Sequence, residues 1–313
     1  MNPILNKELL TKEDAVELLN IPVQSAGFYE LIEKSNAMSR AEYHNKGYIF
    51  AQIGINSARC SGNCKFCSLA KDNFAVDAEM EKSLDDVVAQ AKYIAENRVT
   101  ALFLMTTADY GKEKFLSIAA AVKKVIPHGM ALVANVGDFD LSYARRMKEA
   151  GVTGAYHIVR LNEGTDTDLD PKDRIATLDA IRDAGLDLYY CVEPIGPEHT
   201  YEQIAGEMLR ARDYHVKYMA VMRRVGVPGT ALYENGEITE LELTKIAAVA
   251  RLVARPSMTM NVHEPMMMPL LAGVNQLYAE FGMNPRDTES NTVRGFDVSR
   301  TTRMLREAAW EME

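Results

Sequence analysis

Three cysteines lie close together in the sequence. Cys60, Cys64 and Cys67 are spaced C-x3-C-x2-C in a loop that also contains Gly62. Cysteine thiolates are the ligands of iron–sulfur clusters, which normally take four of them. Three ligands would leave one iron of a 4Fe–4S cluster without a protein partner, and that iron could bind a substrate or a cofactor. The spacing therefore predicts an iron–sulfur cluster with one open coordination position.

A structural zinc site is the alternative for these cysteines. Zinc would require a fourth Cys or His ligand at a second short spacing. No such residue follows Cys67, and His44 stands well before the loop. The remaining cysteine, Cys191, is far away in the sequence, so the pattern does not match the disulfide framework of a secreted protein. We therefore favour the cluster over zinc.

The loop resembles that of the radical S-adenosylmethionine enzymes. Their hallmark is C-x3-C-x2-C after the first barrel strand, with an aromatic residue before the last cysteine, and Phe66 stands there. The resemblance implies that Cys60, Cys64 and Cys67 hold a 4Fe–4S cluster, that S-adenosylmethionine chelates the open iron, and that Phe66 lies beside its adenine. One electron from the cluster would then break a C–S bond and give a 5′-deoxyadenosyl radical, because the cofactor carries the hard chemistry.

Further cofactor-binding candidates follow the second and fourth apolar stretches. Thr107 and Ala108 stand where the family often has a Gly-Gly-Glu-like turn that receives the methionine amino group, and Asp109 is typical of a helix cap. Arg160 can pair with the methionine carboxylate in a fork geometry that lysine cannot copy. Glu163 can accept a hydrogen bond from the amino group or a ribose hydroxyl, or form a salt bridge at the barrel rim.

The fifth and sixth stretches supply the remaining cofactor candidates. Ile195 and Gly196 fall in a segment that resembles the family's adenine-binding Gly-x-Ile-x-Gly-x-x-Glu sequence. Met222 ends the sixth stretch and is assigned to the same binding surface.

Three candidate catalytic residues end the seventh stretch. Asn261, His263 and Glu264 are polar groups at the mouth of an apolar barrel, where packing alone hardly explains them. They could bind substrate, transfer protons or ligate a second metal. A hydrogen-bonded core histidine is the alternative for His263.

The elements that must position these residues alternate regularly along the chain. Short apolar stretches predict strands at 47–55, 100–106, 129–136, 154–160, 187–195, 218–225, 257–263 and 275–281. Amphipathic stretches predict helices at 83–97, 112–125, 141–150, 171–184, 201–214, 239–253 and 298–310. Asp170-Pro171 is typical of a helix start, Gly185 of a helix end, and Thr239 with Glu242 of a capping box.

Strand–helix alternation favours parallel strands joined by crossovers, and eight such units predict an α/β protein with a complete or nearly complete (β/α)8 TIM barrel. An open doubly wound sheet is the alternative. We expect an N-terminal helical segment at 1–45, the barrel at 46–283 and a C-terminal extension at 284–313, packed together as one structural domain. In such a barrel the active site lies at the carboxyl ends of the strands.

The composition and charge of the chain limit the classes of binding partner that we expect. The chain has 313 residues, 47% of them hydrophobic, and a net charge of −9, which predicts neither a nucleic-acid nor a membrane partner. It has no apolar run of about 18 residues and no signal-peptide pattern at its N-terminus, so we expect a cytoplasmic protein. The resemblance implies a small-molecule substrate and a low-potential electron donor such as flavodoxin or ferredoxin, and it leaves a homodimer open.

The sequence is nearest to the biotin synthase, hydrogenase-maturation and methylornithine synthase group. Sulfur insertion as in biotin synthase needs a second cluster, but Leu104 and Val133 stand where further cysteines would lie, and only Cys191 remains. We therefore expect hydrogen abstraction from a small substrate in a cofactor-biosynthesis or maturation pathway. A non-catalytic iron–sulfur carrier and a zinc-stabilised hydrolase or lyase are the competing hypotheses.

Overall fold

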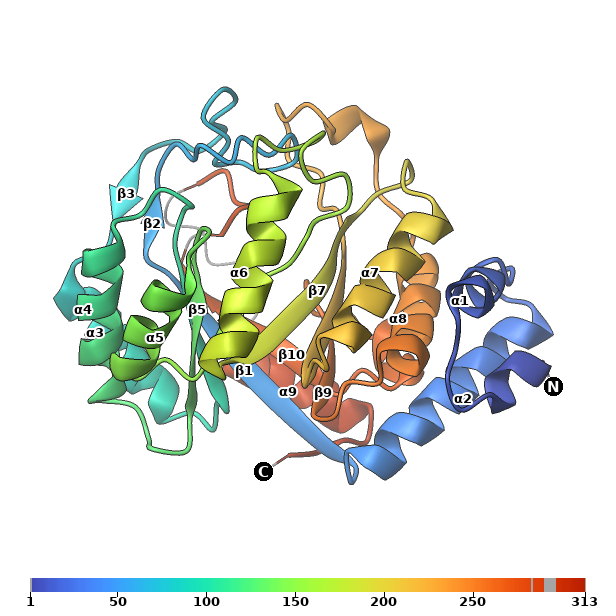
Figure 1. The fold of residues 1–313 in the computed structure, drawn as a ribbon. Helices are drawn as coiled ribbons and strands as arrows, with labels where there is room; N and C mark the ends of the chain where they lie inside the picture. The colour runs from blue at the N-terminus through green and yellow to red at the C-terminus, as the bar shows by residue number, and fades with distance from the viewer. Residues whose placement is uncertain (1, 283, 290–296, 313) are drawn as a thin grey trace.

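The chain folds into a closed barrel of parallel strands in a computed structural model that describes residues 2–282, 284–289 and 297–312 (Figure 1). Within these residues the barrel strands are β1 (Lys46–Gly54), β4 (Ala101–Met105), β5 (Ala131–Asn135), β6 (Gly154–Tyr156), β7 (Asp187–Ile195), β8 (Tyr218–Arg223), β9 (Thr259–Val262) and β10 (Gln276–Phe281). β10 pairs with β1 and closes the barrel. The predicted TIM barrel is confirmed, and the open doubly wound sheet is wrong.

Helices follow nearly all of these strands. They are α3 (Leu84–Ala95), α4 (Lys112–Lys123), α5 (Leu141–Glu149), α6 (Pro171–Ala184), α7 (Tyr201–Asp213) and α8 (Glu240–Ala254). Between β9 and β10 the chain forms only the 3₁₀ helix η3 (Met268–Ala272). The barrel is therefore nearly complete rather than a full set of eight strand–helix units.

The helix ends follow local chemistry. Asp170 caps α6, and Gly185 ends that helix with φ of +66°, a conformation that costs glycine little. Thr239 accepts a hydrogen bond from the backbone amide of Glu242 at 3.1 Å. The Glu242 carboxylate instead accepts from the Tyr201 hydroxyl at 2.8 Å. Of the two hydrogen bonds in the predicted capping box, the structure therefore shows the one accepted by Thr239.

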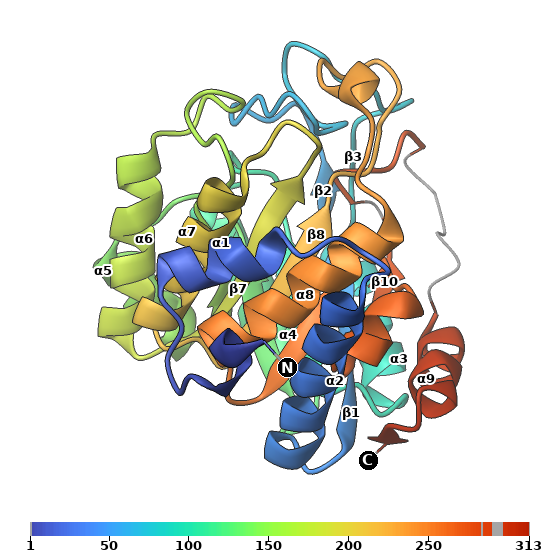
Figure 2. The same ribbon diagram turned by 90° about the vertical axis from the view of Figure 1, so that its right-hand side faces the viewer.

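The N-terminal segment packs on the outside of the barrel. It contains η1 (Pro3–Asn6), α1 (Lys12–Leu19) and α2 (Ala26–Glu42), and Figure 2 shows α1 and α2 beside α8. Arg251 of α8 is fully buried there and donates to Ser39 at 3.0 Å and to Glu42 at 2.5 Å. The buried charge is thus satisfied by α2, which ties this segment to the barrel.

The C-terminal segment contacts both ends of the barrel. The amide of Ser68, in the cysteine loop, donates to Pro285 at 3.0 Å. Farther along, α9 (Val298–Glu307) leads to β11 (Glu311–Met312), which pairs with the first residues of β1. A side chain at Gly47 would meet Trp310 Cβ at 2.9 Å, so glycine allows this close approach. The predicted boundary between 283 and 284 includes residue 283, which lies outside the described residues.

Aromatic rings fill the lower interior of the barrel. Phe50, Phe103, Tyr189, Tyr218 and Tyr278 come from five different strands. The ring of Phe50 contacts the other four at 5.7–5.8 Å between centroids, which requires all five to point inward. This aromatic plug fills the barrel interior below the carboxyl ends of the strands.

Candidate functional site

One cavity opens at the carboxyl ends of the barrel strands. It encloses about 1210 Å³ of space, including the part open to solvent. Nine predicted site residues line it: Cys60, Cys64, Phe66, Cys67, Thr107, Ala108, Arg160, Met222 and His263. The other five, all within the described residues, do not line it: Glu163, Ile195, Gly196, Asn261 and Glu264.

The cysteine loop runs between two short strands, β2 (Asn56–Ser57) and β3 (Met80–Glu81). Within it the amide of Cys60 donates to Leu69 at 2.8 Å, and that of Cys67 donates to Cys64 at 3.0 Å. Two amides point at sulfur atoms: that of Ala108 at Cys60 Sγ, 3.5 Å away, and that of Leu69 at Cys67 Sγ, 3.3 Å away. Donors in these positions stabilise thiolates, as metal ligation requires.

Asp109 ties the cysteine loop to the end of β4. Its carboxylate accepts from the Ser61 amide at 2.6 Å and from the Ser61 hydroxyl at 2.5 Å. The following helix, α4, has Gly111 at its N-cap and no side-chain capping bond. The expectation that Asp109 is a helix cap is therefore wrong, because the carboxylate is used by the cysteine loop.

The chemistry of the three thiols fits an iron–sulfur cluster. Burial raises the pKa of Cys64 to about 11 and also raises that of Cys67, so ionisation of these thiols needs a bound cation such as iron. Thiolates on one tetrahedral zinc ion, with Zn–S bonds of about 2.3 Å, would lie about 3.8 Å apart. Among the described Cys, His, Asp and Glu side chains, these three cysteines do not form a set of ligand atoms within 4.8 Å of one another. This spacing favours a cluster over a single ion.

Arg160 reaches the cavity from the turn after β6. Its Nη1 lies 3.5 Å from Glu163 Oε2, and its backbone amide donates to the same oxygen at 2.9 Å. Arg174 Nε also lies 3.5 Å from that oxygen, and Thr167 donates to the other at 2.8 Å. Burial opposes the charge on Arg160, but the Glu163 carboxylate raises its pKa above the ordinary value. Glu163 thus lies behind Arg160 and holds it, outside the cavity wall.

Thr107 and Ala108 form a tightly held turn in the cavity wall. The Asn56 side chain donates to the Thr107 hydroxyl at 2.9 Å and accepts from the Thr107 amide at 3.0 Å. A side chain at Gly137 would meet Ala108 Cα at 2.9 Å, so the chain after β5 packs directly on this turn. The turn departs from the family's Gly-Gly-Glu-like sequence, and it lies against the cysteine loop through the Ala108 amide and Cys60 Sγ.

Ile195 and Gly196 lie away from the cavity. The pairing of β7 with β8 shifts between Val192 and Ile195, and this irregularity changes which side chains face inward. The Gly196 amide donates to His199 Nδ1 at 2.9 Å. Both predicted residues line a separate surface hollow next to α7, so they do not meet Arg160 and the cysteines.

The predicted catalytic residues in and after β9 have different partners. The Asn261 side chain donates to the backbone of Gln276 at 2.7 Å, which joins β9 to β10. Glu264 accepts from Arg286 Nε at 2.5 Å. Of the three predicted catalytic residues, His263 faces the cavity. Burial and, to a smaller extent, the charge of Arg286 lower the pKa of His263 to about 3.

Several residues that line the cavity were missed in the sequence. Arg286, from the C-terminal segment, donates to Glu280 at 2.7 Å and lies 3.6 Å from Met222 Sδ. Arg286 and Glu264 are far apart in the sequence, and no local sequence pattern predicts their ion pair. Glu193 also lines the cavity and stands two residues after Cys191, where strand alternation places both side chains on one face. That alternation was a usable signal.

Comparison with known proteins identifies a family and several similar proteins. Residues 57–234 match the family described as the Radical SAM superfamily. The chain is 28% identical over 289 residues to biotin synthase of Rhizobium rhizogenes, which covers 85% of each protein. The fold is similar to the crystal structure of methylornithine synthase, with a TM-score of 0.83 and 15% identity; the match covers 99% of this chain and 96% of that one. It is also similar to the structure of the FeFe-hydrogenase maturase HydG from Carboxydothermus hydrogenoformans, with a TM-score of 0.80 and 16% identity, covering 99% of this chain and 77% of that one.

No helix in the described ranges has the length and apolar character needed to span a bilayer.

Proposed function

Because the chain belongs to the Radical SAM superfamily and is a radical SAM enzyme, we propose that it cleaves S-adenosylmethionine reductively at a 4Fe–4S cluster and abstracts hydrogen from a small organic substrate. The proposal rests on the observation that the three loop cysteines and Arg160 face one cavity at the carboxyl ends of the strands. Relatives named biotin synthase and methylornithine synthase support a role in cofactor biosynthesis or maturation.

Cys60, Cys64 and Cys67 are the proposed cluster ligands. When bound, the cluster supplies the electron that splits S-adenosylmethionine into methionine and a 5′-deoxyadenosyl radical. The amides of Ala108 and Leu69 stabilise the thiolates of Cys60 and Cys67. A low-potential donor such as flavodoxin or ferredoxin is the proposed source of the electron.

Arg160 is the proposed partner of the methionine carboxylate. Its raised pKa keeps the guanidinium charged in a buried setting, and bidentate pairing with a carboxylate would fix the orientation of the cofactor. Glu163 and Arg174 are positioning residues, since they contact Arg160 or its partner and hold the turn. Phe66, Thr107 and Ala108 supply the remaining wall for the nucleoside and the amino group.

The proposed substrate is small because the cavity is closed below. The aromatic plug blocks the lower barrel, and the segment at 284–288 lies against the cysteine loop, where Asp77 donates to Thr288 at 3.0 Å. Ligands that fill the site exclude water from it, and this protects a reactive radical.

The structure gives less support to two competing functions, sulfur insertion and cluster transport. Sulfur insertion from an ordinary second cluster needs further thiolates, but Leu104 and Val133 are buried apolar residues on β4 and β5. A cluster carrier needs no cavity with a partly buried arginine beside the cysteines.

The test is an anaerobic assay of the reconstituted chain. We expect about four irons per chain, a cluster absorbance, and 5′-deoxyadenosine on addition of reductant and S-adenosylmethionine. Cys64→Ala should lose the cluster and the product, whereas Cys191→Ala, as the matched control, should keep the cluster. Iron binding without cleavage of S-adenosylmethionine would favour a carrier and overturn the proposal.

A further inference from the structure

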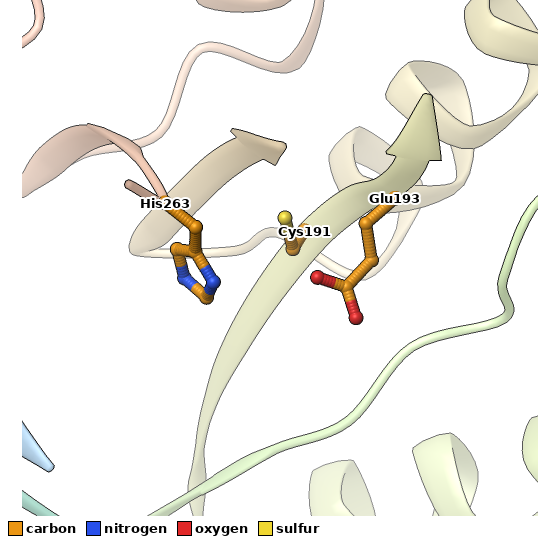
Figure 3. Close-up of side chains that lie close together, drawn as sticks. All are labelled: Cys191, Glu193 and His263. Carbon is orange, nitrogen blue, oxygen red and sulfur yellow. The ribbon is translucent and has the colours of Figure 1, made fainter. Parts of the chain in front are cut away.

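We propose that Cys191, Glu193 and His263 form a site for one divalent zinc-class metal ion at the floor of the cavity, separate from the cysteine loop. Cys191 and Glu193 lie on β7, and His263 follows β9 (Figure 3). The inference extends the proposed function, because it adds a substrate-anchoring ion below the position assigned to S-adenosylmethionine.

The three side chains converge from two strands. Strand alternation points Cys191 and Glu193 to the same inner face, and Figure 3 shows His263 directed toward them. One ligand atom from each lies within 4.8 Å of the other two. A tetrahedral ion with a 2.3 Å sulfur bond and bonds of about 2.0 Å to nitrogen and oxygen would bring these atoms to about 3.4–3.6 Å from one another. Small side-chain rotations supply that contraction.

The trio is buried without a cation bound to it by an ion pair. Glu193, which is 9% exposed, accepts side-chain hydrogen bonds from Tyr156 and Cys191, and within the part of the chain that the structure describes it has no ion pair within 4.0 Å. His263 Nε2 is buried without a hydrogen-bond partner there, and Cys191 is fully buried. Buried charges in proteins are paired or coordinate metals. A bound cation would satisfy all three side chains at once.

The surrounding charge favours a cation. Two guanidiniums interact electrostatically with Glu193, and both are paired elsewhere: Arg286 with Glu264 and Glu280, and Arg160 with Glu163. The carboxylate of Glu193 is therefore available to a bound cation. The rings of Tyr278 and Tyr156 flank His263 at 4.7 and 5.6 Å between centroids and restrict its imidazole.

The donor set defines the class of ion and its role. Thiolate with imidazole selects zinc or a similar transition metal over magnesium or calcium, which prefer oxygen ligands. Three protein ligands leave a fourth position open, as in catalytic zinc sites. Glu193 and His263 line the cavity, so that position faces the space available to substrate. An oxygen or nitrogen of the substrate would bind there and be held for hydrogen abstraction.

The experiment measures zinc in the reconstituted iron–sulfur protein. Anaerobic holoenzyme is given excess zinc, desalted with a weak chelator, and analysed for zinc and iron. We expect about one zinc per chain, with iron unchanged. X-ray absorption at the zinc edge should show one sulfur at about 2.3 Å and nitrogen or oxygen at about 2.0 Å.

Variants identify the ligands. Cys191→Ala and His263→Gln should lose the zinc and keep the iron, and Glu193→Gln should weaken zinc binding at least about tenfold. His199→Gln is the matched control, because His199 is a buried histidine outside the trio, and it should keep both metals.

Three outcomes would overturn the inference: no zinc on the wild-type protein, zinc retained by Cys191→Ala, or a zinc site with three sulfurs and loss of iron. Formation of 5′-deoxyadenosine is measured in parallel. Absent zinc with intact cleavage would refute this site alone, and bound zinc without cleavage would refute the proposed function alone.

Discussion

Replacement of Arg160 by alanine tests the assigned binding site for the methionine carboxylate. The guanidinium faces the cavity, its side chain is 20% exposed, and its pKa is raised by the Glu163 carboxylate against the effect of burial, so it stays charged. A hydrogen bond to a charged group contributes about 1.5–3 kcal/mol. Its loss should weaken S-adenosylmethionine binding by about 10- to 150-fold.

The same substitution should leave the fold and the cluster intact. Without the Arg160 side chain, Glu163 still accepts from the residue 160 amide at 2.9 Å and from Thr167 at 2.8 Å, and Arg174 remains 3.5 Å away. No buried charge is therefore left without a partner. Arg160→Lys should recover only part of the affinity, because lysine cannot make the bidentate pair.

The assay is anaerobic equilibrium binding of S-adenosylmethionine to reconstituted protein, with the cluster absorbance recorded for each sample. Arg182→Ala is a suitable control, since Arg182 lies on the outer face of α6 and pairs with Asp179 and Asp183. Unchanged affinity in Arg160→Ala would remove Arg160 from the site. Loss of the cluster would show that the residue supports the cysteine loop instead.

Three further predictions concern the cysteine loop, the packing of the C-terminal segment and a buried histidine. Asp109→Ala removes both bonds to Ser61, so iron should be lost to a chelator faster than from wild type; equal rates would refute this role. Gly47→Ala would press on Trp310 and should destabilise the protein by about 1–3 kcal/mol in urea unfolding, whereas an unchanged midpoint would contradict the close packing. Burial and the Arg174 charge lower the pKa of His157 from 6.5 to about 3, so the unfolded chain binds a proton that the folded chain does not, and stability should fall as pH falls between these values. His157→Gln should make that fall shallower, and an equal slope would count against a buried neutral histidine.

The sequence predicted the parts of the site that depend on local spacing. One short loop contains Cys60, Cys64, Phe66 and Cys67. Once that loop was predicted to follow a strand, all four residues were predicted to lie at the same site, and they line the same cavity. Arg160 was also placed correctly in the cavity wall, because it directly follows an apolar stretch.

The parts that depend on partners distant in the sequence were not predictable. Glu264 was assigned a catalytic role, but its pairing with Arg286 depends on how the C-terminal segment crosses the barrel mouth. Ile195 and Gly196 were assigned to the cofactor, but the shifted pairing of β7 with β8 directs them elsewhere. A residue pattern carries neither the path of a distant segment nor an irregularity in strand pairing.

The order of strands and helices and the cysteine spacing were determined by the sequence itself, because hydrophobic periodicity and ligand spacing are local properties. Cys191, Glu193 and His263 meet because β8 joins β7 to β9 in the curved sheet, and only the tertiary structure decided this. Residues on separate strands meet through the curvature and register of the whole sheet. These depend on the packing of the entire interior rather than on any one segment.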